Sequence, residues 1–233
     1  MFRASSQPIR LRNLLVVLLT CVSGGVDAFS YLNFERVFPA NMTGNTVQLG
    51  LAIAQLNWEA FGRSGVALLG YVTGVAVGAL IVRKVQREAW SPSITRALLL
   101  EVVVLSTVVA LYLTSNQPQN QPFLTLLIAL ASVAMGLQSV AVQGLSISGV
   151  TTTYITGTIT TAVRRIVQHA RYATDPDTVE EPGSSWLLVM VWAIYLVAAI
   201  GTVAATYIST RLALGVPLTL LTVVVIIAAA DDS

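Results

Sequence analysis

Asn41-Met42-Thr43-Gly44-Asn45-Thr46 and Tyr154-Ile155-Thr156-Gly157-Thr158-Ile159 are two segments of the chain that share a Thr-Gly pair. Each follows a long apolar stretch, and these stretches carry Gly25-Val26-Asp27-Ala28 and Gly136-Leu137-Gln138-Ser139 respectively. The repeat therefore extends upstream of the Thr-Gly pair. Repeated polar segments with glycine inside a membrane domain are where substrate and ion sites tend to lie.

The composition is that of an integral membrane protein. Of the 233 residues, 55% are hydrophobic and only 10% are charged, and the mean hydropathy is +0.76. An ordinary soluble domain has about 25% charged residues. The net charge is +2 and the basic residues are scattered in small groups, so nucleic acid is not an expected partner. Cys21 is the only cysteine, which excludes an intramolecular disulfide.

Six stretches are long and apolar enough to cross a bilayer, which takes about 20 residues. The two Thr-Gly segments, at residues 42–56 and 150–163, are shorter, at about 15 residues or 22 Å of helix. We predict that they enter the membrane and return as re-entrant half-helices. The six predicted transmembrane helices are residues 13–33, 61–82, 95–114, 122–144, 185–209 and 212–230.

The basic residues favour this topology, because cytoplasmic loops collect Lys and Arg. With six crossings and a cytoplasmic N-terminus, 10 of the 13 basic residues lie inside, whereas eight crossings would give 7 inside and 6 outside. We therefore predict six crossings with both termini in the cytoplasm. The outer basic residues are then Arg36, Arg63 and Arg211, and the inner ones are Arg3, Arg10, Arg12, Arg83, Lys84, Arg87, Arg96, Arg164, Arg165 and Arg171.

Each predicted half of the chain holds one spanning helix, one re-entrant segment and two further spanning helices. Three crossings per half turn the second half upside down, so we predict an all-α fold of two inverted repeats. They occupy about residues 13–114 and 122–230 of a single membrane domain over residues 1–233. Tyr71-Val72-Thr73-Gly74 in the second predicted span resembles Tyr195-Leu196-Val197-Ala198 in the fifth, which agrees with this pairing.

Glycine recurs every fourth residue on one face of the second predicted span, at Gly70, Gly74 and Gly78. Small residues at this spacing allow another helix backbone to approach closely in lipid. We interpret these glycines as packing residues rather than site residues. A homodimer through glycine-rich faces stays open.

These motifs together resemble the YoaK family of bacterial membrane proteins, also called DUF1275 or UPF0700. The resemblance also rests on Glu101, Met135-Gly136-Leu137-Gln138 and the run from Thr152 to Thr158, and it covers nearly the whole chain. It implies a multi-pass protein of the bacterial cytoplasmic (inner) membrane, without an established activity and at times labelled a permease. Ser139 departs from the family pattern, in which Asn commonly follows the glutamine, and this would alter the polarity of a site there.

Two carboxylates, Asp27 and Glu101, lie within predicted spans. An ionisable group there costs about 2.5 to 3.5 kcal/mol and is functional by default, so both are candidates for proton coupling. The alternative for Asp27 is a structural role, in which it caps a half-helix or pairs with Arg36. The alternative for Glu101 is a shallow position paired with Arg96 or Lys84.

The N-terminus of a half-helix inside the membrane leaves N–H groups that attract an anion or an electronegative oxygen. In an inverted repeat two such ends meet near the midplane, so we expect one shared site for a small polar or anionic solute. The alternative is that Asn41 and Thr153 cap helices while the threonines bond backbone carbonyls. The predicted substrate-binding residues are Asn41, Thr43, Gly44, Asn45, Thr46, Gln138, Thr153, Thr156, Gly157 and Thr158.

Other kinds of chemistry find little support in the sequence. A single His and a single Cys exclude most metal clusters and nucleophile triads, so we expect no enzyme, no metal and no cofactor. Arg164, Arg165 and His169 are expected to anchor the second half-helix at the membrane surface. With membrane lipid around it, the chain is predicted to be a small secondary transporter or permease, and the alternative is a non-transporting accessory or scaffold protein.

Overall fold

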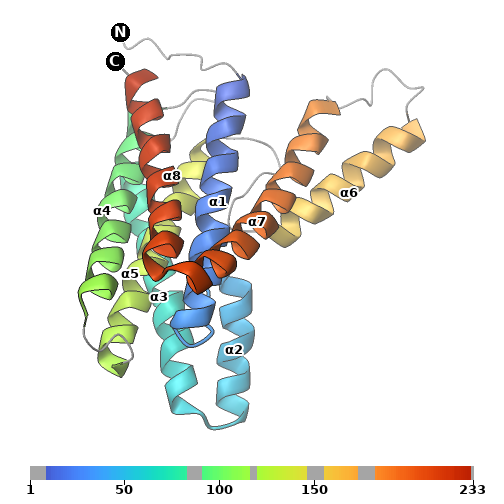
Figure 1. Cartoon of the computed structure of the whole chain (residues 1–233). Helices are drawn as coiled ribbons and strands as arrows, with labels where there is room; N and C mark the ends of the chain where they lie inside the picture. Colours follow the sequence, from blue (N-terminus) through green and yellow to red (C-terminus); the bar gives the residue numbers. More distant parts are fainter. Residues whose placement is uncertain (1–8, 83–90, 116–119, 146–154, 173–181, 232–233) are drawn as a thin grey trace.

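The structure is a computed structural model that describes residues 9–82, 91–115, 120–145, 155–172 and 182–231 (Figure 1). Within these residues every element of secondary structure is an α-helix. The helices are α1 (Ile9–Asn33), α2 (Met42–Ala54), α3 (Trp58–Ile81), α4 (Pro92–Thr114), α5 (Gln121–Gly144), α6 (Ile155–Tyr172), α7 (Pro182–Ile208) and α8 (Thr210–Asp231).

Six of these helices, all except α2 and α6, are long and apolar enough to cross a membrane, and the prediction of six such helices is confirmed. Several begin a few residues before the predicted apolar run, because their first turns are built from capping residues. The side chain of Asn57 accepts a hydrogen bond from the backbone N–H of Ala60 at 3.1 Å, at the start of α3. Ser91 caps α4, and Pro92 occupies its first turn, where no N–H donor is needed.

The two remaining helices begin at the Thr-Gly segments. α2 has 13 residues, or about 20 Å of helix, which is too short to cross a bilayer. α6 continues past Arg164-Arg165, because a helix with basic and apolar faces can extend beyond the hydrocarbon core, and residues 150–154 of the predicted segment lie outside the described residues. In Figure 1 both helices begin near the mid-height of the molecule and run toward opposite ends.

The helices pack in two groups. In the first, which we call the α5 group, α5 lies against α3 and α4, and α2 lies against α3. In the second, the α1 group, α1 lies against α7 and α8, and α6 lies against α7. Among the described residues the helix backbones of the two groups approach each other only where α1 meets α5 and where α4 meets α8. Each group therefore combines the first helix of one sequence half with three helices of the other half.

The glycine face of α3 explains its tight contact with α5. A Cβ atom at Gly74 would overlap the carbonyl oxygen of Val133, and one at Gly70 would overlap that of Ala129. Because backbone atoms of α5 occupy this space, only glycine permits the observed approach. The prediction that these glycines serve packing is confirmed, and their partner is α5 of the same chain.

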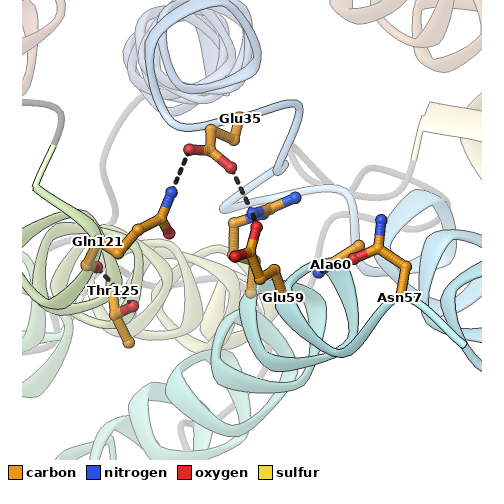
Figure 2. A network of polar contacts seen from close by, with 7 residues as sticks. Glu35, Asn57, Glu59, Ala60, Gln121 and Thr125 are labelled. Carbon is orange, nitrogen blue, oxygen red and sulfur yellow. Dashed lines mark hydrogen bonds and ion pairs between the residues drawn. The ribbon is translucent and has the colours of Figure 1, made fainter.

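Polar contacts join three helix ends at one end of the bundle (Figure 2). Glu35, which follows α1, forms an ion pair with Arg63 in the second turn of α3. The amide of Gln121, at the start of α5, donates to Oε1 of Glu35 at 2.6 Å. The segment after α1 and the beginnings of α3 and α5 therefore lie at the same end of the molecule.

Candidate functional site

Asp27 is buried on α1 and accepts two hydrogen bonds. Its Oδ1 accepts from the backbone N–H of Ala40 at 2.7 Å, and its Oδ2 accepts from the hydroxyl of Tyr195 at 2.5 Å. The carboxylate thus joins α1 to α7 and to the segment that leads into α2. Arg36, the partner considered from the sequence, has an exposed side chain and is not among these partners.

A second contact of the same kind lies between α3 and α5. The hydroxyl of Tyr71 donates to Oγ of Ser139 or accepts from it, at 2.7 Å. In both contacts the backbone of the tyrosine also packs on a glycine: a Cβ at Gly24 would overlap the carbonyl oxygen of Tyr195, and one at Gly136 would overlap that of Tyr71. Each tyrosine is therefore held by its main chain and by its hydroxyl against one partner helix.

The two tyrosine contacts relate Asp27 to Ser139. Asp27 follows Gly24 by three residues, and Ser139 follows Gly136 by three residues. In the second contact Ser139 therefore corresponds to Asp27. A carboxylate stands at one of the two related positions and a hydroxyl at the other.

Glu101 has a different environment. Its side chain is fully buried on α4, and neither carboxylate oxygen has a hydrogen-bond partner. Of the two basic partners considered from the sequence, Arg96 is exposed and Lys84 lies outside the described residues. A buried polar group without a partner costs free energy and suggests a role beyond packing.

A small cavity lies where the two helix groups meet. Its free volume of about 20 Å³ is room for one or two water molecules. Glu101 lies one helical turn before Leu105 and two before Val108, both of which line the cavity, so all three share one face of α4. We call this space the interface cavity; it is lined among others by Gly25 and Ser30 of α1, Leu105 and Val109 of α4, Ala131 of α5 and Pro217 of α8.

Gln138 connects the two groups on one side of the interface cavity. Its Nε2 donates to the carbonyl oxygen of Leu19 at 2.9 Å and to Oγ of Ser23 at 2.6 Å. All three residues are buried. This predicted site residue of α5 is therefore bonded to α1, one to two turns before the residues of α1 that line the cavity.

Two aromatic residues of the cavity lining, Phe29 and Phe34, pack with Tyr112 of α4. The ring of Phe29 lies 5.4 Å from that of Tyr112 and 5.8 Å from that of Phe34, and the rings of Phe34 and Tyr112 are 5.8 Å apart. The Tyr112 hydroxyl donates to Oδ1 of Asn33 at 3.2 Å. We call these three rings the aromatic trio; they join α4 to the end of α1.

The first Thr-Gly segment makes mainly local hydrogen bonds. The Asn41 side chain accepts from the backbone N–H of Gly44 at 3.2 Å and caps α2. Asn45 is buried and bonds both the N–H and the carbonyl of Phe38, at 3.0 and 2.6 Å. Thr46 donates to the carbonyl of Met42 at 2.8 Å. Thr43 has an exposed side chain.

The second Thr-Gly segment is described in part. Thr158 is fully buried in the first turn of α6, and Gly157 is half-buried. Thr153 lies outside the described residues, as does the side chain of Thr156. In the described part of the chain α2 packs on α3 and α6 packs on α7, and α2 and α6 do not contact each other. A solute-binding role for these residues stays a prediction.

Sequence reasoning missed several contacts around these residues. It noted that Tyr71 resembles Tyr195 but not that each hydroxyl binds a polar residue three positions after a glycine. The recurring Gly-x-x-polar spacing in two apolar helices was the available signal. The aromatic trio gave no such signal, because Tyr112 of α4 is distant in sequence from the two rings at the end of α1.

Comparison with known proteins shows that the chain is similar to a bacterial transmembrane protein. It is 35% identical over 156 residues to the UPF0700 transmembrane protein YoaK of Bacillus subtilis (strain 168), a match that covers 66% of this chain and 67% of the relative. No solved structure matches it. Residues 15–230 match the model of a family described as a protein of unknown function, DUF1275. The resemblance seen in the sequence motifs is thereby confirmed, and this multi-pass membrane protein belongs to the DUF1275 family.

Proposed function

We propose that the protein is a small secondary transporter, built from two inverted halves, that moves a small polar solute across the bacterial cytoplasmic membrane. The observation that carries this proposal is the pairing of the helices. Transporters of this kind commonly consist of inverted repeats that rock against each other around a central site. Both termini are proposed to lie in the cytoplasm.

The set of helix–helix contacts stays the same when the two halves of the chain are exchanged. If α1 to α4 take the places of α5 to α8, the contact of α3 with α5 becomes that of α7 with α1, and the contact of α4 with α5 becomes that of α8 with α1. The contacts of α2 with α3 and of α3 with α4 likewise have counterparts in α6 with α7 and in α7 with α8. The two contacts between the groups, α1 with α5 and α4 with α8, map onto themselves. This exchange supports a two-fold relation between the halves.

The positions of the polar residues support the same relation. Asp27 and Ser139 each lie three residues after a glycine, at Gly24 of α1 and Gly136 of α5. Each binds the hydroxyl of a tyrosine in the third helix of the other half. Asn45 and Thr158, which each follow a Thr-Gly pair directly, are both fully buried.

The re-entrant form of α2 is supported by the polar contacts at one end of the bundle. Glu35 lies before α2 and Arg63 lies after it, and the two form an ion pair. A helix that crossed the membrane between these residues would place them on opposite sides. We therefore propose that α2, and α6 as its counterpart, enter the membrane and return.

Asp27 and Glu101 are the proposed proton-coupling residues, because they are carboxylates buried in two of the six long apolar helices. Their surroundings suggest different contributions. Asp27 already accepts hydrogen bonds from two donors, so a change in its protonation would weaken its bonds to α7 and to the segment before α2. Glu101 holds no partner and has two acceptor oxygens available.

A non-transporting scaffold protein is the second proposal, and the local bonding of the first Thr-Gly segment favours it. Asn41 and Asn45 each bond backbone groups next to α2, as residues that only stabilise the fold would do. In this case the same residues would be needed for folding and not for movement of any solute.

Solute entry into proteoliposomes separates the two proposals. Liposomes with and without the protein are mixed with hyperosmotic methylammonium thiocyanate, potassium formate, potassium nitrate, urea or glycerol. Valinomycin is added for the potassium salts, and thiocyanate crosses lipid as a permeant anion, so charge is balanced for each salt. Stopped-flow light scattering then reports reswelling, and trapped pyranine reports the pH inside. A transporter reswells faster with at least one of these solutes than protein-free liposomes do, whereas equal rates with all five contradict transport.

The coupling role is tested in the same vesicles. If Glu101 or Asp27 couples protons, Glu101→Gln or Asp27→Asn abolishes the pH change that accompanies solute entry. A variant that keeps the pH change at the wild-type rate rules out the coupling role of that residue.

A further inference from the structure

We propose that the solute passes between the two helix groups, along the surface shared by α1, α4, α5 and α8, and that it is a small molecule that donates hydrogen bonds or carries a positive charge. This rests on the proposed transport function and specifies where it takes place. It differs from the site expected from the sequence, which lay between the two Thr-Gly helices.

The first argument is the way the helices are grouped. Gly74 and Gly136 bring α3 and α5 into backbone contact, and Gly24 does the same for α1 and α7. Such close packing resists separation, because interiors are dense and contacts of this kind are lost all at once. The contacts of α1 with α5 and of α4 with α8 are what joins the helix backbones of one group to those of the other in the described residues. This surface is therefore where the molecule can open with the least loss of packing.

The second argument is the order of side chains along this surface. On α1 the order is Ser23, then Gly25, then Phe29 and Ser30, and the last three line the cavity. α4 runs in the same direction as α1 in Figure 1 and shows the same order. There Glu101 comes first, then Leu105 and Val109 at the cavity, then Tyr112. In both helices a polar residue therefore comes first and residues that line the cavity follow it, and each helix also carries a ring of the aromatic trio.

The third argument is the charge of this surface. Glu101 is fully buried with both carboxylate oxygens lacking a partner, and it shares a helix face with two cavity-lining residues. Among the described residues no Lys or Arg lines the interface cavity: Arg96 and Arg211 are exposed, and Arg12 lies near the start of α1. When Glu101 is deprotonated, its carboxylate attracts a cation or a donor and repels an anion. The surface therefore suits an ammonium-like or hydrogen-bond-donating solute.

Thiol labelling with reagents of opposite charge tests the location and the charge preference together. Cys21 is replaced by Ser, and single cysteines are introduced as Val109→Cys in the cavity, Val103→Cys on the exposed face of the same helix, and Thr43→Cys at the Thr-Gly segment. The reagents are the trimethylammonium-ethyl and sulfonato-ethyl methanethiosulfonates, which are similar in size. Mass spectrometry measures the modified fraction over time in proteoliposomes.

The proposal predicts that the cysteine at position 109 reacts faster than the one at position 103, which faces lipid. It also predicts a ratio of cationic to anionic reaction rates that is about tenfold higher at position 109 than at position 43. Glu101→Gln in the Val109→Cys protein lowers this ratio to that of position 43. If Glu101→Gln does not purify as a monodisperse protein, the labelling rates and charge ratios at positions 109, 103 and 43, with Glu101 intact, test the proposal.

Equal labelling at positions 109 and 103 would overturn the location, and equal charge ratios at positions 109 and 43 would overturn the solute class. Labelling does not require transport, so the two proposals fail separately. If no solute reswells the liposomes while position 109 behaves as expected, transport is rejected and the interface site stands. If solutes enter but position 43 alone is labelled, transport stands and the path lies along α2.

Discussion

Asp27 and Glu101 have the same functional group, and the protein surrounds them in opposite ways. Asp27 accepts from a backbone N–H and from a tyrosine hydroxyl, whereas both oxygens of Glu101 lack partners. Paired polar groups hold a structure together, and an unpaired buried group is tolerated where function requires it. The sequence marks both residues equally, because hydropathy records the carboxylate but not its partners.

The bond between Tyr195 and Asp27 gives the first prediction. Tyr195→Phe leaves Oδ2 of Asp27 buried without its donor, so the variant should lose about 1 to 3 kcal/mol of unfolding free energy. Thermal unfolding in detergent measures the loss. Tyr207→Phe, on the same helix and 86% exposed, is the matched control and should change stability by less than about 0.5 kcal/mol. Equal unfolding midpoints for the two variants would contradict the proposed role of this bond.

Asn45 gives the second prediction and addresses a predicted substrate-binding residue. Asn45→Ala removes both bonds to the backbone of Phe38 and should cost about 2 to 3 kcal/mol. Thr46→Ala removes only an exposed hydroxyl bonded within its own helical turn and should stay within about 0.5 kcal/mol. If Asn45→Ala instead keeps full stability and loses solute entry, the residue binds solute and does not brace the segment before α2.

At the scale of the helix, the helix bounds predicted from the sequence are accurate where the helix coincides with a continuous run of apolar residues. The predicted span 122–144 and α5 (Gln121–Gly144) differ by one residue at one end, since the apolar run and the helix coincide. The starts of α3 and α4 were placed too late, because Asn57 and Ser91 are polar capping residues outside the apolar run. α6 was predicted to end too soon, at residue 163, because its second half follows an amphipathic pattern that a search for continuous apolar residues does not detect.

The contact between α3 and α5 gives the third prediction. Gly74→Ala places a methyl group against the carbonyl oxygen of Val133, so the helices must separate, at a cost of about 1 to 3 kcal/mol. Gly65→Ala, also on α3, meets no atom within 4 Å and should be neutral or stabilise by up to about 1 kcal/mol, because alanine is the better helix former. Thermal unfolding and the yield of monodisperse protein compare the two variants. Equal stability would mean that α3 and α5 are not in backbone contact.

At the scale of the molecule, the grouping of helices could not be predicted from the chain. A repeat in the sequence suggests that each half forms its own unit, yet α1 packs with α7 and α8 while α5 packs with α3 and α4. The cause is the placement of single glycines: Gly24 and Gly136 accept the backbone of a helix from the other half. Their partners are distant in sequence, so no local pattern identifies them. For the same reason the interface cavity was not anticipated.

The number of crossings gives the last prediction, and three cysteines in the Cys21→Ser protein decide it. If α2 re-enters the membrane, as proposed from the ion pair of Glu35 with Arg63, Arg36→Cys and Leu56→Cys should react with a membrane-impermeant maleimide from the same side. Arg96→Cys, near the start of α4, should react from the opposite side. If α2 crossed the membrane, the cysteines at positions 36 and 96 would react from the same side, and the cysteine at position 56 would react from the opposite side. Labelling in right-side-out and inverted vesicles distinguishes the two topologies. The cysteine that reacts from the side opposite to the other two is at position 96 if α2 re-enters and at position 56 if α2 crosses.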